Sequence, residues 1–338
     1  MPASMGAESH PRVSVCIPTV DRVDLLREAI ASVAAQTWRD FEVVIADNSG
    51  DSGLQRRIDG VLAEFPGLRF VLKRHPFRLD AIENFNSLID TAHGELWACL
   101  TDDDRLRPNF LARSVEALDR HPDCALTFSD HWIIRFDGTV DERETKHVSA
   151  LFGRSVLREG VYRHDRLFEI VLRQSMCLQT AVFRRPVIAS LRFAPGIMSG
   201  DQSLFLRLSA GRQQFHAYYI DERLFEYRVH GAQLSNTVNR KTLMLSQIAA
   251  YESVPEIPPR HEQAFKSKLS RCYLALAMVE AEEGDATSAR AHAGKSLSLT
   301  LSLRNTLGGL LVTSAPFAVR KLRQLRDRLG GLRNFRAG

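Results

Sequence analysis

Three consecutive aspartates, Asp102-Asp103-Asp104, follow an apolar run at residues 96–100 and precede Pro108. Carboxylates this close together repel one another unless a positive charge shares their site. At the end of a buried strand, a hard divalent cation held by oxygen ligands and completed by a substrate phosphate would supply that charge. The same residues would also suit an exposed acidic turn in front of a helix that begins at Pro108.

The segments around the aspartates alternate between strand and helix patterns. Apolar runs typical of buried strands occur at residues 13–17, 41–46, 69–72 and 96–100, with helical patterns between them. Asp21 stands where a helix N-cap is expected, and Asp80 with Glu83 forms a capping box. Strands that are apolar throughout and alternate with helices predict an α/β fold, with a mostly parallel sheet flanked by helices.

Polar residues follow three of these predicted strands. Pro18-Thr19 ends the first, Asp47-Asn48-Ser49 ends the second, and the aspartates end the fourth. In open α/β sheets, ligands bind outside the carboxyl ends of the strands. The pattern therefore predicts a nucleotide-type pocket there. No glycine-rich phosphate loop follows the first strand, which argues against a dinucleotide fold and against a P-loop.

Composition indicates an ordinary globular protein with an uneven distribution of charge. The chain has 338 residues, 44% of them hydrophobic, and a net charge of +5. Seven basic residues and a single acid, Asp327, lie between residues 320 and 336. On a helix, one face of this tail would carry Leu322, Leu325, Leu329 and Leu332. Such a helix suits the surface of an anionic membrane, the interpretation favoured here, or packing on the protein itself with a solvated basic face. Nucleic acid is not an expected partner, because no platform of interleaved aromatic and basic residues accompanies the charge.

The remaining patterns concern compartment and domains. The five cysteines are scattered and mostly set among apolar residues, and no signal peptide is evident, so a cytoplasmic location is expected. A hairpin is expected around Asp137-Gly138. Amphipathic helices follow residue 243, including a hairpin of the tetratricopeptide kind that turns at Gly284-Asp285. The expected division is an α/β catalytic domain at 12–240 and a helical region at 241–338 that ends in the basic amphipathic helix.

Several motifs occur in a fixed order along residues 12 to 240. They are residues 13–19, the run from Gln36 to Glu42, Ala92-His93-Gly94-Glu95, Thr101 to Asp104, Gly200-Asp201-Gln202, and Tyr227 to His230. In this order they resemble family 2 glycosyltransferases. The resemblance implies the GT-A (Rossmann-like) fold and an inverting hexosyltransferase that uses a nucleotide-diphosphate sugar.

The resemblance assigns the donor site to residues near the strand ends. Pro18, Thr19 and Asp47 match the loops that hold the base and ribose, and a carboxylate such as Asp47 can accept the N–H of a pyrimidine. Asp102 would lie near the ribose, and Arg78 would face the phosphates. Asp47 would alternatively be a turn-forming residue, and Arg78 a solvated surface residue.

The metal site implied by the resemblance consists of Asp103, Asp104 and His230, with Mn²⁺ or Mg²⁺ as the cofactor. The family motif is usually Asp-x-Asp-Asp, whereas Thr101 occupies the first position here. Asp103 would coordinate the cation and Asp104 would support it. A structural histidine is the alternative interpretation of His230.

Asp201 matches the general base of the family, in which Glu-Asp usually stands where this chain has Gly200-Asp201. One carboxylate is enough to take the proton from an acceptor hydroxyl in a single displacement. A plain helix N-cap is the alternative role for Asp201. The resemblance further implies a glycan or lipid-linked acceptor and a function in bacterial surface polysaccharide synthesis at the cell envelope. The alternatives are a nucleotide-sugar-binding or scaffold protein without catalysis, and a nucleotidyltransferase, which the missing phosphate loop disfavours.

Overall fold

The computed structural model describes residues 10–210, 215–231 and 238–314. The chain separates into two compact units, residues 1–196 with 200–233 and residues 197–199 with 234–338. The sheet belongs to the first unit. The division of function between 12–240 and 241–338 stays a prediction.

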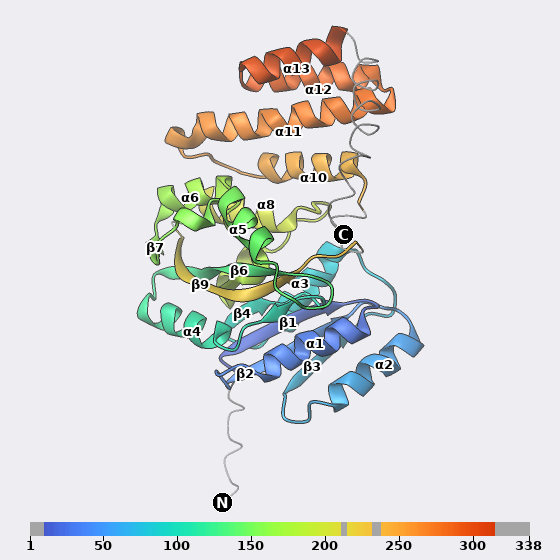
Figure 1. The fold of residues 1–338 in the computed structure, drawn as a ribbon, viewed down its shortest axis with the longest axis vertical. Coiled ribbons are helices and arrows are strands. Elements are labelled where there is room, and N and C mark those ends of the chain that lie inside the picture. The colour runs from blue at the N-terminus through green and yellow to red at the C-terminus, as the bar shows by residue number, and fades with distance from the viewer. Residues whose placement is uncertain (1–9, 211–214, 232–237, 315–338) are drawn as a thin grey trace, which may run out of the picture. The chain divides into compact units, whose positions relative to one another are not determined.

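The described strands of the first unit form one mixed sheet in the order β3-β2-β1-β4-β8-β6-β9-β5, with β7 paired to β9 (Figure 1). The strands are β1 (Val13–Thr19), β2 (Phe41–Asp47), β3 (Phe70–Arg74), β4 (Leu96–Cys99), β5 (Arg105–Leu106), β6 (Cys124–Ile134), β7 (Gly160–Tyr162), β8 (Ala181–Arg184) and β9 (His216–Arg228). Strands β3, β2, β1 and β4 run parallel, and β8 is antiparallel to β4 and β6. The predicted α/β class is confirmed.

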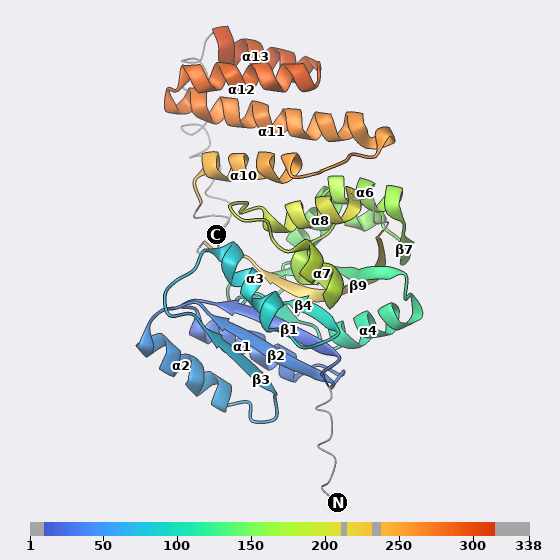
Figure 2. The same cartoon turned by 180° about the vertical axis from the view of Figure 1, so that it is seen from behind.

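Helices cover both faces of this sheet (Figures 1 and 2). They are α1 (Val23–Ala34), α2 (Ser52–Ala63), α3 (Ala81–Thr91), α4 (Phe110–Arg120), α5 (Glu142–Leu151), α6 (His164–Leu172), α7 (Arg185–Leu191) and α8 (Gly200–Ala210). Alternate β1 residues, Val13, Val15 and Ile17, pack in one buried cluster with apolar residues of α1, α2 and α4. Because successive side chains of a strand point to opposite faces, the intervening residues meet α3 and the elements on the other side.

The buried carboxylate of Glu42 joins two of the motifs found in the sequence. It accepts hydrogen bonds from the Ser14 hydroxyl at 2.6 Å and from the backbone N–H of His93 at 2.7 Å. A side chain at Gly94 would meet the Ser14 backbone nitrogen at 2.5 Å, so only glycine fits there. Glu42, the last residue of the motif from Gln36 to Glu42, therefore holds the chain in place where it enters β4, the strand that precedes the aspartates.

Gln36 fixes the other end of the same segment. Its buried amide donates to the carbonyl of Arg107 at 2.8 Å and accepts from the backbone N–H of Leu111 at 3.0 Å. Thr37 adds a backbone hydrogen bond to the carbonyl of Pro108 at 2.9 Å. Gln36 and Thr37, at the start of the same motif, thus hold the segment that follows the aspartates.

Two local predictions need correction or extension. Asp21 is not the N-cap of α1: the cap residue is Arg22, without a side-chain capping bond. The expected turn at Asp137-Gly138 is present, with Gly138 at a φ of 83°. The chain that follows this turn forms helix α5. Asp141 caps this helix by accepting a hydrogen bond from the backbone N–H of Glu144.

The second unit consists of stacked helices. They are α10 (Arg240–Glu252), α11 (Glu262–Glu283), α12 (Ala286–Leu299) and α13 (Leu303–Ser314). Helices α11 and α12 form the predicted hairpin, in which Gly284 adopts a φ of 92° and Asp285 caps α12. The basic tail with Leu322, Leu325, Leu329 and Leu332 lies outside the described residues. Within the described part of the chain, the helices are too short or too polar to cross a membrane.

We expect Glu42→Gln to lower the free energy of unfolding of the first unit by about 1–3 kcal/mol, because the amide nitrogen would face donors in a buried site. Urea unfolding followed by tryptophan fluorescence measures this selectively, since all three tryptophans, at positions 38, 97 and 132, belong to the first unit. Glu64→Gln is the matched control, because its exposed ion pair with Arg27 contributes little. Equal effects of both substitutions would contradict this account.

Candidate active site

The three aspartates lie directly after β4, and all of them are buried. Asp102, Asp103 and Asp104 are 1%, 7% and 2% exposed, respectively. These values exclude the exposed acidic turn that the sequence left open. Three buried carboxylates in a row require compensating charge, and the fold supplies it from distant parts of the chain.

Arg22, from the start of α1, bridges the first two aspartates. Its Nη2 lies 2.5 Å from Oδ1 of Asp102, and its Nη1 lies 2.5 Å from Oδ2 of Asp103. The other oxygen of Asp102 accepts a hydrogen bond from the Thr19 hydroxyl at 2.9 Å. Residues from the ends of β1 and β4 are therefore joined at one edge of the sheet, as predicted for Thr19 and Asp102.

Arg228, at the end of β9, holds the other side of the triplet. Its backbone N–H donates to Oδ1 of Asp104 at 2.8 Å, and its Nε donates to the carbonyl of Asp103 at 2.7 Å. The same guanidinium bonds Glu28 of α1 at 2.6 Å. Thr101 donates its hydroxyl to the second oxygen of Asp104. The threonine at the first motif position thus serves as a hydrogen-bond donor to the last acid.

His230 contacts the central aspartate. Its Nε2 lies 3.0 Å from Oδ2 of Asp103, the oxygen that Arg22 also contacts. The imidazole ring packs edge-on against Phe136, with 6.0 Å between the ring centroids. The structure therefore brings His230 to the triplet, and the ring is buried against it.

Burial and mutual repulsion change the acidity of the triplet. Burial raises the pKa of Asp102 to about 6, although Arg22 and the Thr19 hydroxyl oppose the shift. Burial and the Asp103 charge also raise the pKa of Asp104, against the bonds from Thr101 and Arg228. Protonation or a nearby cation would relieve the same repulsion among these carboxylates.

The residues proposed for base recognition lie next to Thr19. Thr19 and Asp47 are paired across β1 and β2, with Pro18 one position earlier. Asp47 is fully buried, and its Oδ1 accepts from the backbone and hydroxyl of Ser49. Its Oδ2 accepts no hydrogen bond and lies 3.6 Å from the guanidinium of Arg74. Asp47 is thus a turn former at one oxygen and an unsatisfied acceptor at the other.

Arg78 is exposed on the loop between β3 and α3. Asn48 ties this loop to the end of β2, because its amide donates to and accepts from the backbone of Leu79 at 3.0 and 2.7 Å. The backbone of Arg78 therefore lies beside the loop that follows Asp47. No contact between Arg78 and the aspartates appears among the described residues.

Asp201 is the second residue of α8, rather than its N-cap, and is exposed. The surrounding protein nevertheless raises the pKa of its carboxyl by desolvation. Desolvation raises the pKa of the Cys177 thiol to about 12, and the charges of Asp201 and Asp104 add to this shift.

Gly200 has a packing explanation. A side chain here would meet Cδ1 of Ile82 at 2.8 Å and Cδ1 of Phe193 at 3.1 Å. A larger residue at this position would therefore require the terminal methyl of Ile82, on α3, to shift.

The donor set fits a divalent cation chemically, because buried carboxylate oxygens are the preferred ligands of Mg²⁺ and Mn²⁺. Among the described residues, Oδ1 of Asp102 accepts no hydrogen bond and forms an ion pair with the guanidinium of Arg22. As the side chains stand, residues 10–210, 215–231 and 238–314 contain no group of three His, Cys, Asp or Glu residues arranged to hold an ion.

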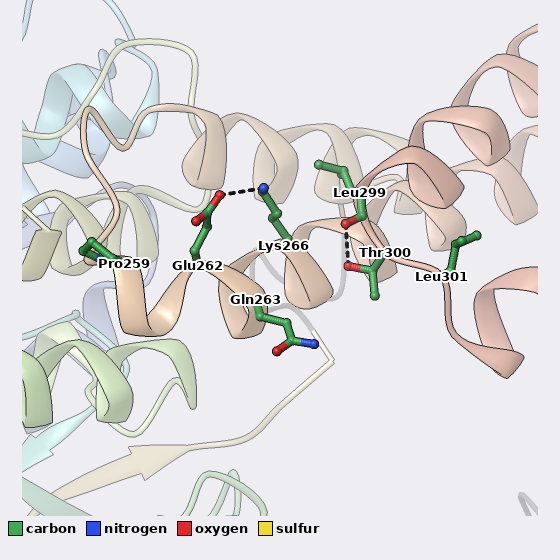
Figure 3. A pocket seen from close by; sticks show the side chains of 7 residues that line it. All are labelled: Pro259, Glu262, Gln263, Lys266, Leu299, Thr300 and Leu301. Atoms are coloured by element: carbon green, nitrogen blue, oxygen red, sulfur yellow. Dashed lines mark hydrogen bonds and ion pairs between the residues drawn. The ribbon is translucent and has the colours of Figure 1, made fainter.

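A pocket of about 420 Å³ lies elsewhere, within the second unit (Figure 3). Its lining residues are Pro259, Glu262, Gln263, Lys266, Leu299, Thr300 and Leu301. Lys266 is paired with Glu262 at 2.6 Å. No predicted site residue lines this pocket.

Sequence reasoning missed the cationic half of the site. In the sequence, Arg22 has no feature that distinguishes it from any residue at a helix start. Arg228 lies in the Tyr227 to His230 motif, but the motif implies no role for it. The available signal was the repulsion within the triplet, which requires basic partners, but only the fold reveals which arginines reach it.

A family model described as glycosyl transferase family 2 matches residues 14–185. The chain belongs to this family. Among curated relatives, an uncharacterized protein of Mycobacterium tuberculosis is 29% identical over 233 residues. The GalNAc(5)-diNAcBac-PP-undecaprenol beta-1,3-glucosyltransferase of Campylobacter jejuni is 28% identical over 220 residues. Each match covers 65% of this chain and 65% of the relative's own length.

Solved structures of similar fold support the GT-A architecture of this family 2 protein. S. aureus TarS 1–349 in complex with UDP-GlcNAc superposes with a TM-score of 0.67 at 14% identity, over 94% of this chain and 92% of that one. The mannosyltransferase PcManGT of Pyrobaculum calidifontis, in complex with GDP-Man and Mn²⁺, gives 0.58 at 16% identity, over 95% and 88%. At these identities the likeness establishes the fold alone.

We expect Arg228→Gln to lower the free energy of unfolding of the first unit by about 1–3 kcal/mol, because the carbonyls of Asp103 and Phe136 lose the guanidinium that donates to them in a buried site. Arg113→Gln is the control. Arg113 contacts three glutamates at the surface, so this substitution should lower the free energy of unfolding by less than about 1 kcal/mol. Urea unfolding followed by tryptophan fluorescence compares the two. A loss no larger for Arg228→Gln than for Arg113→Gln would show that the triplet does not depend on Arg228.

Proposed function

We propose that this family 2 protein is a metal-assisted, inverting glycosyltransferase that transfers a sugar from a nucleotide-diphosphate donor to a hydroxyl group. The observation that supports it most directly is the buried cluster of Thr19, Asp102 and Asp103 at the carboxyl edge of the sheet, with His230 against it. Family membership supports the same reaction class.

The donor would bind at the ends of β1 and β2. Oδ2 of Asp47 accepts no hydrogen bond and is available to the N–H of a base. Pro18 and Thr19 would form the wall beside it, and Asp102 would lie near the ribose. Arg78, exposed on the adjacent loop, would approach the phosphates.

Asp103, Asp104 and His230 would hold Mn²⁺ or Mg²⁺. When bound, such a cation neutralises the charge that grows on a leaving diphosphate. Thr101 and Arg228 keep Asp104 oriented through hydrogen bonds to both of its oxygens. The mannosyltransferase structure with GDP-Man and Mn²⁺ supports this cofactor by analogy of fold.

Asp201 would act as the general base. The acceptor oxygen forms a bond to the anomeric carbon while the bond from that carbon to the diphosphate oxygen breaks. The nucleoside diphosphate leaves with the electron pair, and the hydroxyl proton passes to the Asp201 carboxylate. General-base assistance of this kind contributes roughly 10²–10⁴ in rate.

The acceptor would be a glycan or a lipid-linked saccharide of the bacterial cell envelope. The undecaprenol-linked acceptor in the name of the Campylobacter relative and the abequosyltransferase RfbV of Salmonella typhimurium, 29% identical over 116 residues, support this choice. The protein would work in polysaccharide synthesis in the cytoplasm, in peripheral contact with the membrane through the predicted basic helix.

Asp103→Ala should abolish the cation-dependent part of nucleotide binding, because it removes the carboxylate at the centre of the cluster. Calorimetric titration of UDP, GDP and dTDP, each with and without Mn²⁺, measures this effect and identifies the base. Asp123→Ala is the control, since Asp123 pairs with Arg163 at the surface. Wild-type binding of the same nucleotide by Asp103→Ala would contradict the metal assignment.

Asp201→Asn should leave nucleotide binding unchanged and reduce release of nucleoside diphosphate from the nucleotide-sugar by at least about 10²-fold. Asparagine retains the acceptor for the backbone N–H of Gln202, which Asp201 bonds at 2.7 Å, so the fold is preserved. Normal release by this variant would refute the base assignment. Nucleotide binding without turnover by the wild-type protein would instead favour the scaffold alternative.

The pH dependence provides a second readout of the same assignment. Only the ionised carboxylate accepts a proton, and desolvation raises the pKa of Asp201 above its usual value of 3.8. As the pH falls, kcat/KM should therefore decline earlier than it would with an ordinary aspartate. An acid limb that is unchanged in Asp201→Asn would contradict this origin.

A further inference from the structure

Arg22 contacts Asp103, the central aspartate to which the proposed function assigns the cation, and bridges it to Asp102. Its two Nη atoms contact Oδ1 of Asp102 and Oδ2 of Asp103, each at 2.5 Å. The remaining oxygen of Asp102 is engaged by Thr19. The guanidinium therefore covers the oxygen of Asp102 that no hydrogen bond satisfies.

The side chain of Arg22 is the accessible member of this cluster. It is 32% exposed, whereas the side chains of Asp102 and Asp103 are 1% and 9% exposed. Arg22 is also the N-cap residue of α1 but makes no side-chain capping bond. Movement of its guanidinium toward solvent would leave the helix start and the two aspartates in place.

Among the residues that the structure describes, Arg22 is the basic side chain paired with the Asp102 carboxylate. Arg228 bonds the carbonyl of Asp103 and the carboxylate of Glu28 instead. His230 shares Oδ2 of Asp103 with Arg22. An incoming cation would therefore compete with Arg22 for Asp103.

We infer that Arg22 is a positioning residue that competes with the divalent cation for Asp103 while its second contact, to Asp102, holds it in place, and that the donor diphosphate releases it. This inference rests on the proposed function. A guanidinium matches the geometry of phosphate as well as that of carboxylate, so the diphosphate offers Arg22 a second partner. Cation and nucleotide then bind cooperatively, because each favours the same position of one side chain.

The inference is tested by titrating the full-length protein with Mn²⁺ alone and following free Mn²⁺ by electron paramagnetic resonance. An opposite charge within about 4–6 Å changes the affinity of a carboxylate for a proton roughly 10- to 1,000-fold, and the same field acts on a metal ion. Arg22→Gln should therefore bind Mn²⁺ about tenfold or more tightly than the wild type without nucleotide. Saturating UDP or GDP, whichever binds, should strengthen Mn²⁺ binding less in Arg22→Gln than in the wild type.

Arg22→Lys separates charge from shape. Lysine keeps the positive charge, so Mn²⁺ affinity should stay close to that of the wild type. Unchanged or weaker Mn²⁺ binding by folded Arg22→Gln, or equally tight binding by Arg22→Lys and Arg22→Gln, would overturn the inference. Tryptophan fluorescence and thermal unfolding establish that each variant is folded.

The double variant Arg22→Gln with Asp103→Ala separates this inference from the proposed function. If it loses the tight Mn²⁺ binding of Arg22→Gln, the ion binds at the triplet and the inference stands. If it keeps that binding, Mn²⁺ lies elsewhere, and both the inference and the proposed metal site fail. Loss of Mn²⁺ binding in Asp103→Ala together with no gain in Arg22→Gln would refute the inference alone.

Discussion

The first unit is organised around the compensation of three adjacent buried carboxylates. Asp102, Asp103 and Asp104 repel one another at the end of β4, and burial removes the water that would screen them. Arg22 at the start of α1 pairs with two of these carboxylates. Arg228 at the end of β9 donates its Nε–H to the carbonyl of Asp103 and its backbone N–H to Asp104. Pairing these distant segments fixes where the two elements meet β4.

The family motifs contribute to this arrangement mechanically. Glu42 binds the chain just before β4, and Gln36 binds it just after the triplet. Neither side chain belongs to the triplet. Their burial and hydrogen bonding hold the segment that carries it, which gives a physical reason for polar residues at such covered positions. The two departures from the family pattern also fit their surroundings: Thr101 bonds Asp104, and Gly200 packs closely against the Ile82 side chain of α3.

The site combines tightly held acids with one accessible base. Asp102 and Asp103 are almost completely buried, whereas a third of the Arg22 side chain is exposed to solvent. Arg22 is therefore the side chain of this cluster that can move toward solvent, whereas moving Asp102 would break its hydrogen bond from Thr19. In the proposed function, charge balance and cation binding involve the same side chains.

The α/β class, the parallel direction of the early strands and the polar residues at their carboxyl ends could be predicted from the sequence, because strand periodicity and turn chemistry are local. The helical hairpin at Gly284 could be predicted as well. Only the tertiary structure shows that Arg22 pairs with Asp102 and Asp103 and that Arg228 bonds the backbone of Asp103, since both arginines are distant in sequence from the triplet. It also shows that Arg22, and not Asp21, is the cap residue of α1. Long-range ion pairs depend on how strands and helices are juxtaposed, and residue spacing along the chain does not contain that information.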